Sequence, residues 1–215
     1  MNEEYLIPIV DARGRVAGYA DRWLTHTVFE EGGKLVLGQK HVGICVACQD
    51  PLGRILVQRR RHVIFDGYWS LTADTHPRKY EGLQVESLAT ASTRCAREDL
   101  GINVTKWVDA LVVSYSARDP RNPKYCENEL MHLMVGKYNG TVRANKKNVY
   151  GFEWKEPREL RKEAIQDESK DPKDRKYAPW IRPVFEELER RKKDWASLAS
   201  SQTRLNRLWR KSGVA

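Results

Sequence analysis

The sequence predicts a mixed α/β fold, in which the strands of a sheet pack against helices. Short β-rich runs occur on both sides of one amphipathic helical segment, and more helical sequence follows near the end of the chain. Strands before and after a helix, with further helix at the end, are typical of this layered architecture. A length of 215 residues suits one domain with extensions or two small domains.

The N-terminal part of the chain predicts hairpins. The stretch "YLIPIVDARGRVAGYADR" places two short apolar runs around a polar turn, and "GGKLVLGQ" follows it. The next stretch, "HVGICVACQDPLGRILVQRR", joins two β-rich runs through Asp-Pro-Leu-Gly. Turn residues between apolar runs are a hairpin signal, so we expect a hairpin in the first stretch and another in the last.

One amphipathic helix is predicted by "VESLATASTRCAREDLGI". Small and apolar residues recur there at helical spacing, and Gly101 is placed to end the helix just after its last turn. The residues at that spacing are Val85, Leu88, Ala89, Ser92, Cys95, Ala96 and Asp99.

Strands and then helices are expected after residue 101. "WVDALVVSYSA" and "NELMHLMVGKY" are expected to be strands around a polar loop, and "GFEWKEPRELRKEA" is expected to form a strand, a turn and a helix. The segment from Ala178 to Ser212 is expected to be helical, with Pro179 or Pro183 near its first start.

Composition and charge narrow the class of protein. The hydrophobic fraction of 40% and charged fraction of 31% indicate a globular protein, and no apolar run approaches the roughly 20 residues of a membrane helix. The N-terminus lacks a basic-then-apolar signal pattern, so we expect a cytoplasmic location. The net charge of +9 suits nucleic acid, an anionic membrane or a phosphorylated small molecule as partner. No aromatic-interleaved binding platform accompanies the basic runs, so a solvated basic face is the simpler interpretation.

The four cysteines do not indicate a metal or disulfide framework. Cys45 and Cys48 form a C-x-x-C in an expected strand, where positions i and i+3 face opposite sides of the sheet. Cys95 and Cys126 add no second pair at zinc spacing. A reducing compartment fits this usage.

Three of the five histidines and two acids form a candidate metal site. His41 opens a strand, His76 lies in the small-residue loop "WSLTADTHP", and His26 precedes a Gly-Gly hairpin that can return it towards His41. Glu127 and Glu129 are two residues apart on a strand and share one face. If that face is internal, the carboxylates repel and need a cation such as Mn²⁺, Mg²⁺ or Zn²⁺; on an outer face they have no such meaning.

The expected helix also carries a degraded motif. Glu86, Arg94 and the pair Glu98-Asp99 approximate the Nudix box, G-x5-E-x7-R-E-U-x-E-E-x-G-U, in which acids on one helical face hold a metal against a diphosphate. Tyr80 stands at the leading glycine position, and Cys95 replaces the glutamate after the arginine.

Five segments, taken in order, resemble type I isopentenyl-diphosphate isomerases of the Nudix superfamily. They are "HVGICVACQDPLGRILVQRR", "GYWSLTADTHP", the helix over residues 86 to 102, "ENEL" and "YAPW". The resemblance covers roughly residues 5 to 190. It implies a Nudix α/β/α sandwich with a mixed sheet over residues 1–190, followed by a basic helical tail over residues 191–215.

The resemblance also implies site residues, cofactors and a substrate. It places a divalent ion (Mn²⁺ or Zn²⁺) on His26, His41, His76, Glu127 and Glu129. It places Mg²⁺ beside Asp99, the diphosphate of a prenyl substrate near Arg59 and Arg60, and aromatic faces for a carbocation at Trp180 and Tyr115. Glu129 and the residue two before the loop histidine are the implied proton-transfer groups.

Asp74 departs from the family, which has a catalytic cysteine at that position. Asp74 has three interpretations: a proton-transfer group with a raised pKa, a metal or substrate ligand, or a turn residue bonded to nearby backbone N–H groups. Three functions therefore stay open. They are isomerase-like proton transfer on a prenyl diphosphate, a Nudix diphosphohydrolase, and a non-catalytic protein whose basic tail binds nucleic acid or a partner.

Overall fold

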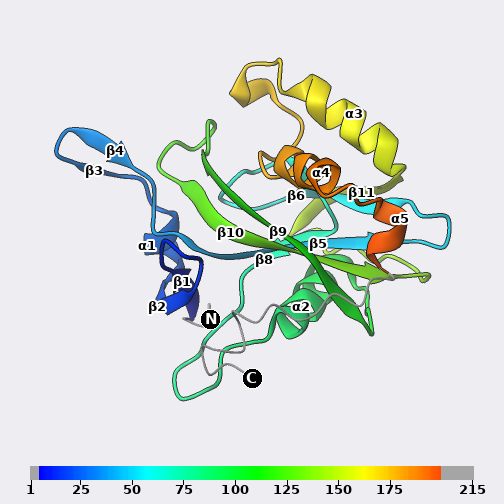
Figure 1. The fold of residues 1–215 in the computed structure, drawn as a ribbon, viewed down its shortest axis with the longest axis horizontal. Helices are drawn as coiled ribbons and strands as arrows, with labels where there is room; N and C mark the ends of the chain where they lie inside the picture. Colours follow the sequence, from blue (N-terminus) through cyan, green and yellow to red (C-terminus); the bar gives the residue numbers. More distant parts are fainter. Residues whose placement is uncertain (1–4, 200–215) are drawn as a thin grey trace.

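The computed structural model describes residues 5–199, and in this range one mixed sheet of nine strands organises the chain. Helices lie on both faces of the sheet (Figure 1), which confirms the predicted α/β class. The strands of the sheet are β1 (Leu6–Val10), β2 (Val16–Asp21), β5 (His41–Gln49), β6 (Ile55–Arg60), β7 (Trp69–Ser70), β8 (Ala73–Thr75), β9 (Trp107–Arg118), β10 (Cys126–Lys137) and β11 (Val149–Lys155).

Strand β5 is the centre of the sheet. It pairs with β10 in parallel, and β10 pairs in turn with β9 in antiparallel orientation. The other neighbours of β5 are β1, β6 and β8, while β11 forms the edge beyond β6. The parallel pairing sets Glu129 opposite His41, at the end of the sheet where the candidate site lies.

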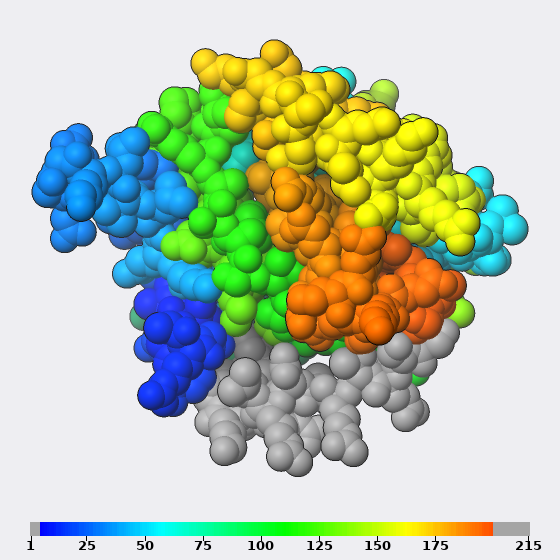
Figure 2. Space-filling model, turned by 45° about the horizontal axis from the view of Figure 1, so that its top comes forward, coloured from blue at the N-terminus to red at the C-terminus, as the bar shows by residue number. Residues whose placement is uncertain are grey.

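Two hairpins form in the N-terminal part of the chain. The predicted first hairpin forms from β1 and β2, with Leu6 opposite Asp21. A second, β3 (Phe29–Glu31) with β4 (Lys34–Val36), turns at Gly32 and Gly33 and stands apart from the main sheet (Figures 1 and 2). Between them lies the short helix α1 (Arg22–His26), whose N-terminal amides are capped by the Asp21 carboxylate.

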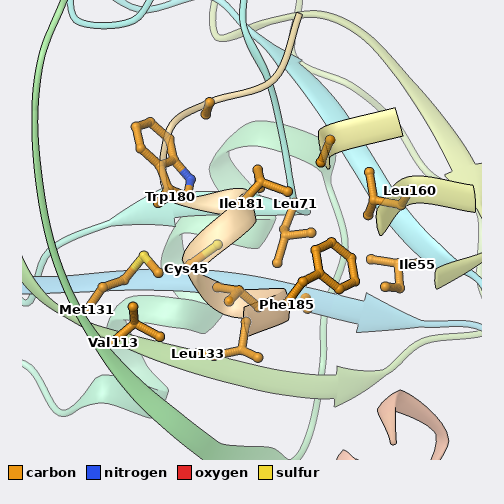
Figure 3. Packing of buried hydrophobic residues seen from close by; sticks show 14 of the residues in the cluster. Cys45, Ile55, Leu71, Val113, Met131, Leu133, Leu160, Trp180, Ile181 and Phe185 are labelled. Atoms are coloured by element: carbon orange, nitrogen blue, oxygen red, sulfur yellow. The ribbon is translucent and has the colours of Figure 1, made fainter. Parts of the chain in front are cut away.

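Two apolar cores fill the space between the sheet and the helices. One packs α2 (Leu88–Leu100) against β5 and β10; the other packs α3 (Pro157–Asp167), α4 (Ile181–Arg190) and α5 (Trp195–Leu198) on the opposite face (Figure 3). Cys45 lies in the α4 core and Cys48 in the α2 core, as the predicted strand alternation requires. All four cysteines are free thiols.

The helix boundaries follow the predicted signals. Ser87 caps α2 by accepting a bond from Thr90 N, and Gly101 ends it in the left-handed region at φ 65°. Helix α3 begins at Pro157, and Pro183 lies in the first turn of α4. A short 3-10 turn, Pro172–Asp174, joins α3 to the segment before α4.

The packed structure extends beyond residue 190, where the sequence predicted the domain to end. Trp195 and Leu198 of α5 are buried in the α4 core, and Gln49 Nε2 donates to the Trp195 carbonyl at 2.8 Å. Residues 200–215 of the expected basic tail lie outside the described residues. No helix between residues 5 and 199 has the length and apolar character needed to cross a membrane.

Candidate active site

A cavity of about 490 Å³ opens at the end of the sheet where β5, β8 and β10 meet α1 and α2. Five arginines, three histidines and five carboxylates line it, together with a smaller apolar part. Its lining is Tyr5, Arg22, Trp23, His26, Ile44, Gln58, Arg60, Arg61, His62, Val63, Ile64, Asp74, Thr75, His76, Arg78, Arg94, Cys95, Glu98, Asp99, Tyr115, Glu127, Glu129, Met131, Asn148 and Trp180.

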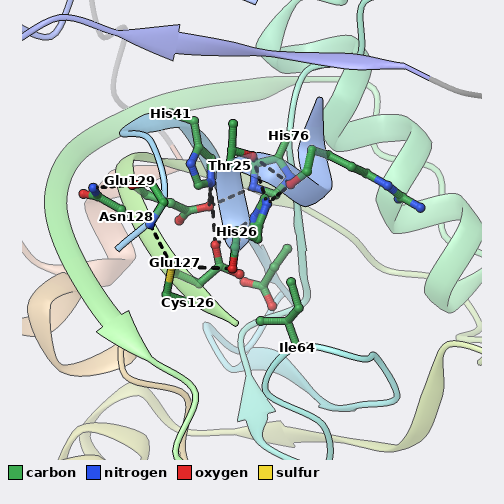
Figure 4. Close-up of polar contacts among 12 residues, drawn as sticks. Thr25, His26, His41, Ile64, His76, Cys126, Glu127, Asn128 and Glu129 are labelled. Atoms are coloured by element: carbon green, nitrogen blue, oxygen red, sulfur yellow. Dashed lines mark hydrogen bonds and ion pairs between the residues drawn. The ribbon is translucent and has the colours of Figure 1, made fainter. Parts of the chain in front are cut away.

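The three predicted histidines and two predicted glutamates converge at the inner end of this cavity (Figure 4). The three imidazole rings lie 4.4 to 5.0 Å apart, centroid to centroid. One nitrogen from each of His26, His41 and His76 and one Glu127 oxygen all lie within 4.8 Å of one another. Glu129 completes the group, with one oxygen 3.0 Å from His76 Nε2 and 3.6 Å from His41 Nε2.

Close backbone packing brings His26 next to His41 despite the fourteen residues between them. The chain leading to β5 passes α1 so closely that a Cβ on Gly38 would lie 1.8 Å from the Thr25 carbonyl oxygen. Gly43 has the same function for Glu129, because a Cβ there would lie 2.2 Å from the carboxyl carbon. Sequence reasoning missed both glycines, since the close approach involves segments far apart in the chain.

Bonds on the outer ring nitrogens aim the inner nitrogens of two histidines at the centre. His26 Nδ1 contacts the Arg22 carbonyl, and His41 Nδ1 lies 2.8 Å from the Gln39 carbonyl. A backbone carbonyl accepts only from N–H, so Nε2 of each ring is the nitrogen left to ligate. Among the described residues, His41 Nε2 is buried without a hydrogen-bond partner, 3.6 Å from oxygens of Glu127 and Glu129, while Glu127 Oε2 lies 3.0 Å from His26 Nε2.

The pKa shifts within the cluster also favour a bound cation. Burial raises the pKa of both glutamates, but the neighbouring imidazoles lower that of Glu129 to about 2 and hold that of Glu127 well below its usual range. Burial alone would lower the pKa of His41, yet the two carboxylates raise it to about 10. In the metal-free protein a proton therefore balances part of this buried negative charge. Imidazole nitrogens and carboxylate oxygens in this arrangement fit a divalent ion, which would displace that proton.

The degraded box on α2 fixes the loop that carries His76. Glu86 accepts from Arg94 Nε at 2.8 Å and from Arg94 Nη2 at 2.9 Å, and its carboxylate also accepts from the backbone N–H of Arg78. Arg94 Nη2 donates to the carbonyl of His76 at 3.1 Å. The Glu86–Arg94 pair thus connects the N-terminal part of α2 to the His76 carbonyl and the Arg78 backbone N–H.

We expect Arg94→Met to destabilise the fold by about 3–5 kcal/mol, because it leaves the largely buried Glu86 carboxylate without its partner. Urea unfolding measures this loss. Arg190→Met is the matched control, since the Arg190 side chain is 68% exposed and an exposed pair contributes about 0–1 kcal/mol. Equal losses in the two variants would contradict the assigned role of Arg94.

Asp99 and Glu98 reach the cavity from the last turn of α2. Asp99 accepts from Asn148 Nδ2 at 2.9 Å, and burial raises its pKa despite this bond. Cys95, at the position of a box glutamate, is buried beside them with its Sγ 3.6 Å from Asp99. The helix therefore offers two carboxylates to the cavity.

Asp74 lies on β8 and faces the cavity from the α4 side. Its carboxylate accepts from Arg60 Nη1 at 2.6 Å, from Ser70 Oγ at 3.0 Å and from Trp180 Nε1 at 3.0 Å. Burial raises the pKa of Asp74, while the Arg60 guanidinium opposes the rise. Side chains hold this carboxylate, so the turn interpretation, which requires bonds to local backbone N–H groups, does not describe it.

Tyr115 and Trp180 complete the apolar side. The Tyr115 hydroxyl donates to Glu129 at 2.7 Å, and burial beside the two glutamates raises the pKa of Tyr115 well above its usual value. Trp180 is 2% exposed, and the Arg60 guanidinium lies over its ring at 5.0 Å.

Arg59 and Arg60, the two arginines expected near the diphosphate, do not both face the cavity as free charges. Arg59 does not line the cavity; it lies on the other face of β6, over the Tyr150 ring, because successive residues of a strand point to opposite sides. Arg60 reaches the cavity, but its charge is paired with Asp74. Sequence reasoning missed Arg22, Arg61 and Arg78. No described carboxylate pairs with Arg22 or Arg61, and Arg78 has only a 3.4 Å contact with Glu98.

Comparison with known proteins identifies the family. No family model matches the chain. The isopentenyl-diphosphate Delta-isomerase of Burkholderia multivorans is 31% identical over 155 residues, which cover 71% of this chain and 77% of the relative. The chain belongs to the isopentenyl-diphosphate Delta-isomerase family. The Halorhodospira halophila member is 28% identical over 194 residues, covering 89% of this chain and 98% of the relative.

Solved structures agree on the fold. The protein DR0079 from Deinococcus radiodurans superposes with a TM-score of 0.56, covering 86% of this chain and 98% of that one. A MutT protein from Methanosarcina mazei gives 0.52, covering 72% and 96%. Both are 16% identical to this chain, so the likeness concerns the fold alone. The predicted Nudix architecture is confirmed.

The residue that the family resemblance singled out, Asp74, lies in this cavity. The position that resembles the family's catalytic cysteine holds a carboxylate paired with a buried arginine. The sequence showed the substitution but not the pairing, because Arg60 and Asp74 are fourteen residues apart on different strands.

Proposed function

We propose that this protein isomerises a prenyl diphosphate by moving its carbon–carbon double bond, as the names of its curated relatives state for them. One observation carries the proposal. A single cavity is lined by two separate protonatable groups, by a histidine–glutamate cluster that could hold a metal ion, and by arginines with at most one longer acid contact. An allylic shift needs one group to deliver a proton to one alkene carbon and another to remove a proton from a different carbon, with no net change in composition.

The diphosphate is assigned to the arginines that carry free charge. Arg22, Arg61 and Arg78 line the cavity; Arg22 and Arg61 have no carboxylate partner among the described residues, and Arg78 has a 3.4 Å contact with Glu98. Arg60 and Arg94 are already paired, with Asp74 and Glu86 respectively. A planar guanidinium binds phosphate oxygens through two parallel bonds, so two unpaired arginines and Arg78, which has one longer acid contact, suit a diphosphate. Asp99 and Glu98, beside them, suit a Mg²⁺ ion that shares the phosphate oxygens.

The hydrocarbon end is assigned to the opposite side, where Tyr115, Met131, Ile64 and Trp180 line the cavity. The proposed proton-transfer groups there are Asp74 and the pair of Glu129 with Tyr115. Glu129 and the Tyr115 hydroxyl share a 2.7 Å bond through which a proton can move. Asp74 is held by three donors, so its position is fixed before substrate binds.

The histidine cluster is the proposed site of a second divalent ion, Mn²⁺ or Zn²⁺, held by His26, His41, His76, Glu127 and Glu129. When bound, the ion supplies positive charge that stabilises the buried carboxylates and lowers the proton affinity of groups they contact. The four free thiols also fit the proposed cytoplasmic location.

A diphosphohydrolase is the weaker candidate. Hydrolysis in a Nudix site relies on several helix carboxylates that bind the metals activating water. Here Glu86 is engaged by Arg94, and Cys95 offers a buried thiol in place of a carboxylate. Glu98 and Asp99 alone remain.

Incubation of the full chain with isopentenyl diphosphate and longer prenyl diphosphates in D₂O tests the proposal, with Mg²⁺ and Mn²⁺ present. We expect deuterium in the hydrocarbon part of the product by NMR and mass spectrometry, and an intact diphosphate. Release of phosphate without deuterium on carbon would establish hydrolysis instead. Absence of both reactions would overturn the proposed catalytic function.

A further inference from the structure

We infer that Tyr5 is a positioning residue, which holds Arg22 and Arg78 in place to bind the anionic end of the substrate. The inference rests on the proposed function, because it assumes that these arginines bind the diphosphate. Tyr5 itself lines the cavity, next to both arginines, although it lies far from either in sequence.

The backbone fixes where Tyr5 stands. Leu6, the first residue of β1, pairs on one side with Asp21 of β2. On the other side it exchanges two bonds with Lys79, Leu6 N to Lys79 O at 3.0 Å and Lys79 N to Leu6 O at 2.9 Å. The strand that begins at Leu6 therefore lies between the segments that contain Asp21 and Lys79. The residue before it must lie between the segment that begins α1 and the segment that follows His76.

The side chain then contacts both arginines. The Arg22 guanidinium lies over the Tyr5 ring at 4.8 Å from its centroid, and the Arg78 guanidinium lies over the same ring at 4.7 Å. Arg22 Nη1 also donates to the Tyr5 hydroxyl at 2.5 Å. Tyr80 packs edge-on against Tyr5, with 6.0 Å between the ring centroids, and limits its movement.

The charges explain why such a residue is needed. Two guanidinium groups around one ring repel each other, and no good carboxylate partner offsets this: Arg22 has none among the described residues, and Glu98 lies 3.4 Å from Arg78. Arg78 Nε is also buried without a hydrogen-bond partner. The negative face of an aromatic ring attracts both cations while leaving their N–H groups unneutralised. A carboxylate in its place would hold the arginines but cancel the charge that a diphosphate requires.

Pyrophosphate binding in the presence of Mg²⁺, measured by titration calorimetry on the full chain, tests this role. We expect Tyr5→Leu to raise the Kd about 10-fold and Tyr5→Phe, which keeps the ring, about 3-fold. Tyr138→Leu is the control, because Tyr138 is also half-buried but does not line the cavity. It should leave the Kd unchanged, and thermal unfolding of each variant reports any loss of fold.

A double-mutant cycle separates positioning from general damage. In an Arg78→Met background, Tyr5→Leu should raise the Kd by only about 3-fold, because Arg22 is then the one arginine left for Tyr5 to position. Independent effects of the two changes, or an unaltered Kd in Tyr5→Leu, would overturn the inference.

The result of the Tyr5 experiments can be distinguished from the result of the isomerase assay. Coupling between Tyr5 and Arg78 in pyrophosphate binding, together with no deuterium transfer to a prenyl chain, would keep the positioning role and reject the isomerase. Where turnover is observed, Tyr5→Leu should raise KM for the prenyl diphosphate and leave kcat nearly unchanged.

Discussion

Asp74→Asn should lower turnover of a prenyl diphosphate by about 10²–10⁴-fold, the usual contribution of a general acid–base group. Asparagine keeps the shape of the side chain and an oxygen that can accept from Ser70 and Trp180, but it cannot exchange a proton. Pyrophosphate affinity should stay within about threefold, because the arginines assigned to the diphosphate do not contact Asp74. Steady-state kinetics and calorimetry measure the two quantities.

The variant also removes a charge, and a control has to account for that. Arg60 would remain buried with only neutral partners, which alone destabilises a protein. Asp109→Asn is matched to it: Asp109 accepts from His132 at 3.0 Å, and its side chain is 11% exposed against 14% for Asp74. Asp109 does not line the cavity. We expect both variants to lose stability and only Asp74→Asn to lose turnover.

Asp74→Cys separates proton transfer from simple charge. The thiol restores the residue that the family resemblance places here, and it can exchange a proton although it cannot pair strongly with Arg60. Partial activity in Asp74→Cys, above that of Asp74→Asn, supports proton exchange at this position. Wild-type turnover in Asp74→Asn would instead show that Asp74 only holds Arg60 and Trp180, and that the chemistry lies elsewhere.

The grouping of the histidines and glutamates could be predicted in part because some of its signals are local. Glu127 and Glu129 share a face by strand periodicity alone, and the loop around His76 resembles a family motif. The arginine assignment was not accessible in the same way. Strand alternation predicts that Arg59 and Arg60 face opposite sides of the sheet. Only the pairing of β5 with β6 and β8 shows that Arg60 contacts Asp74. Arg22 and Arg78 approach each other through the backbone bonds of Leu6, which no periodicity in the sequence indicates.

The same limit applies to the end of the domain. The basic run after residue 190 predicted a separate tail, because charge dominates its composition. Trp195 and Leu198 nevertheless complete the α4 core. Two apolar residues at helical spacing outweigh several exposed lysines and arginines, since burial of each large apolar side chain stabilises by about 1.5–3 kcal/mol while the charges stay in water.

His76→Ala should abolish tight binding of one divalent ion, with a loss in affinity of more than about 100-fold. Replacing a group that only supports a metal ligand already costs about 10–100-fold, and a ligand itself contributes more. His76 is the ligand that links the cluster to the substrate loop, because its ring bonds Glu129 while Arg94 holds its carbonyl. Elemental analysis after gel filtration, and titration of the metal-free protein with Mn²⁺, measure the change.

His132→Ala is the matched control for that experiment. His132 is also a buried histidine paired with a carboxylate, and it lies on β10 three residues from Glu129, but its side chain meets Asp109 and does not line the cavity. It should destabilise the fold and retain a full equivalent of metal. Retention of a full equivalent by His76→Ala would mean that the cluster is a hydrogen-bonded group without an ion. The unpartnered Nε2 of His41 argues against that state, because a polar atom so deeply buried is rarely left without a partner.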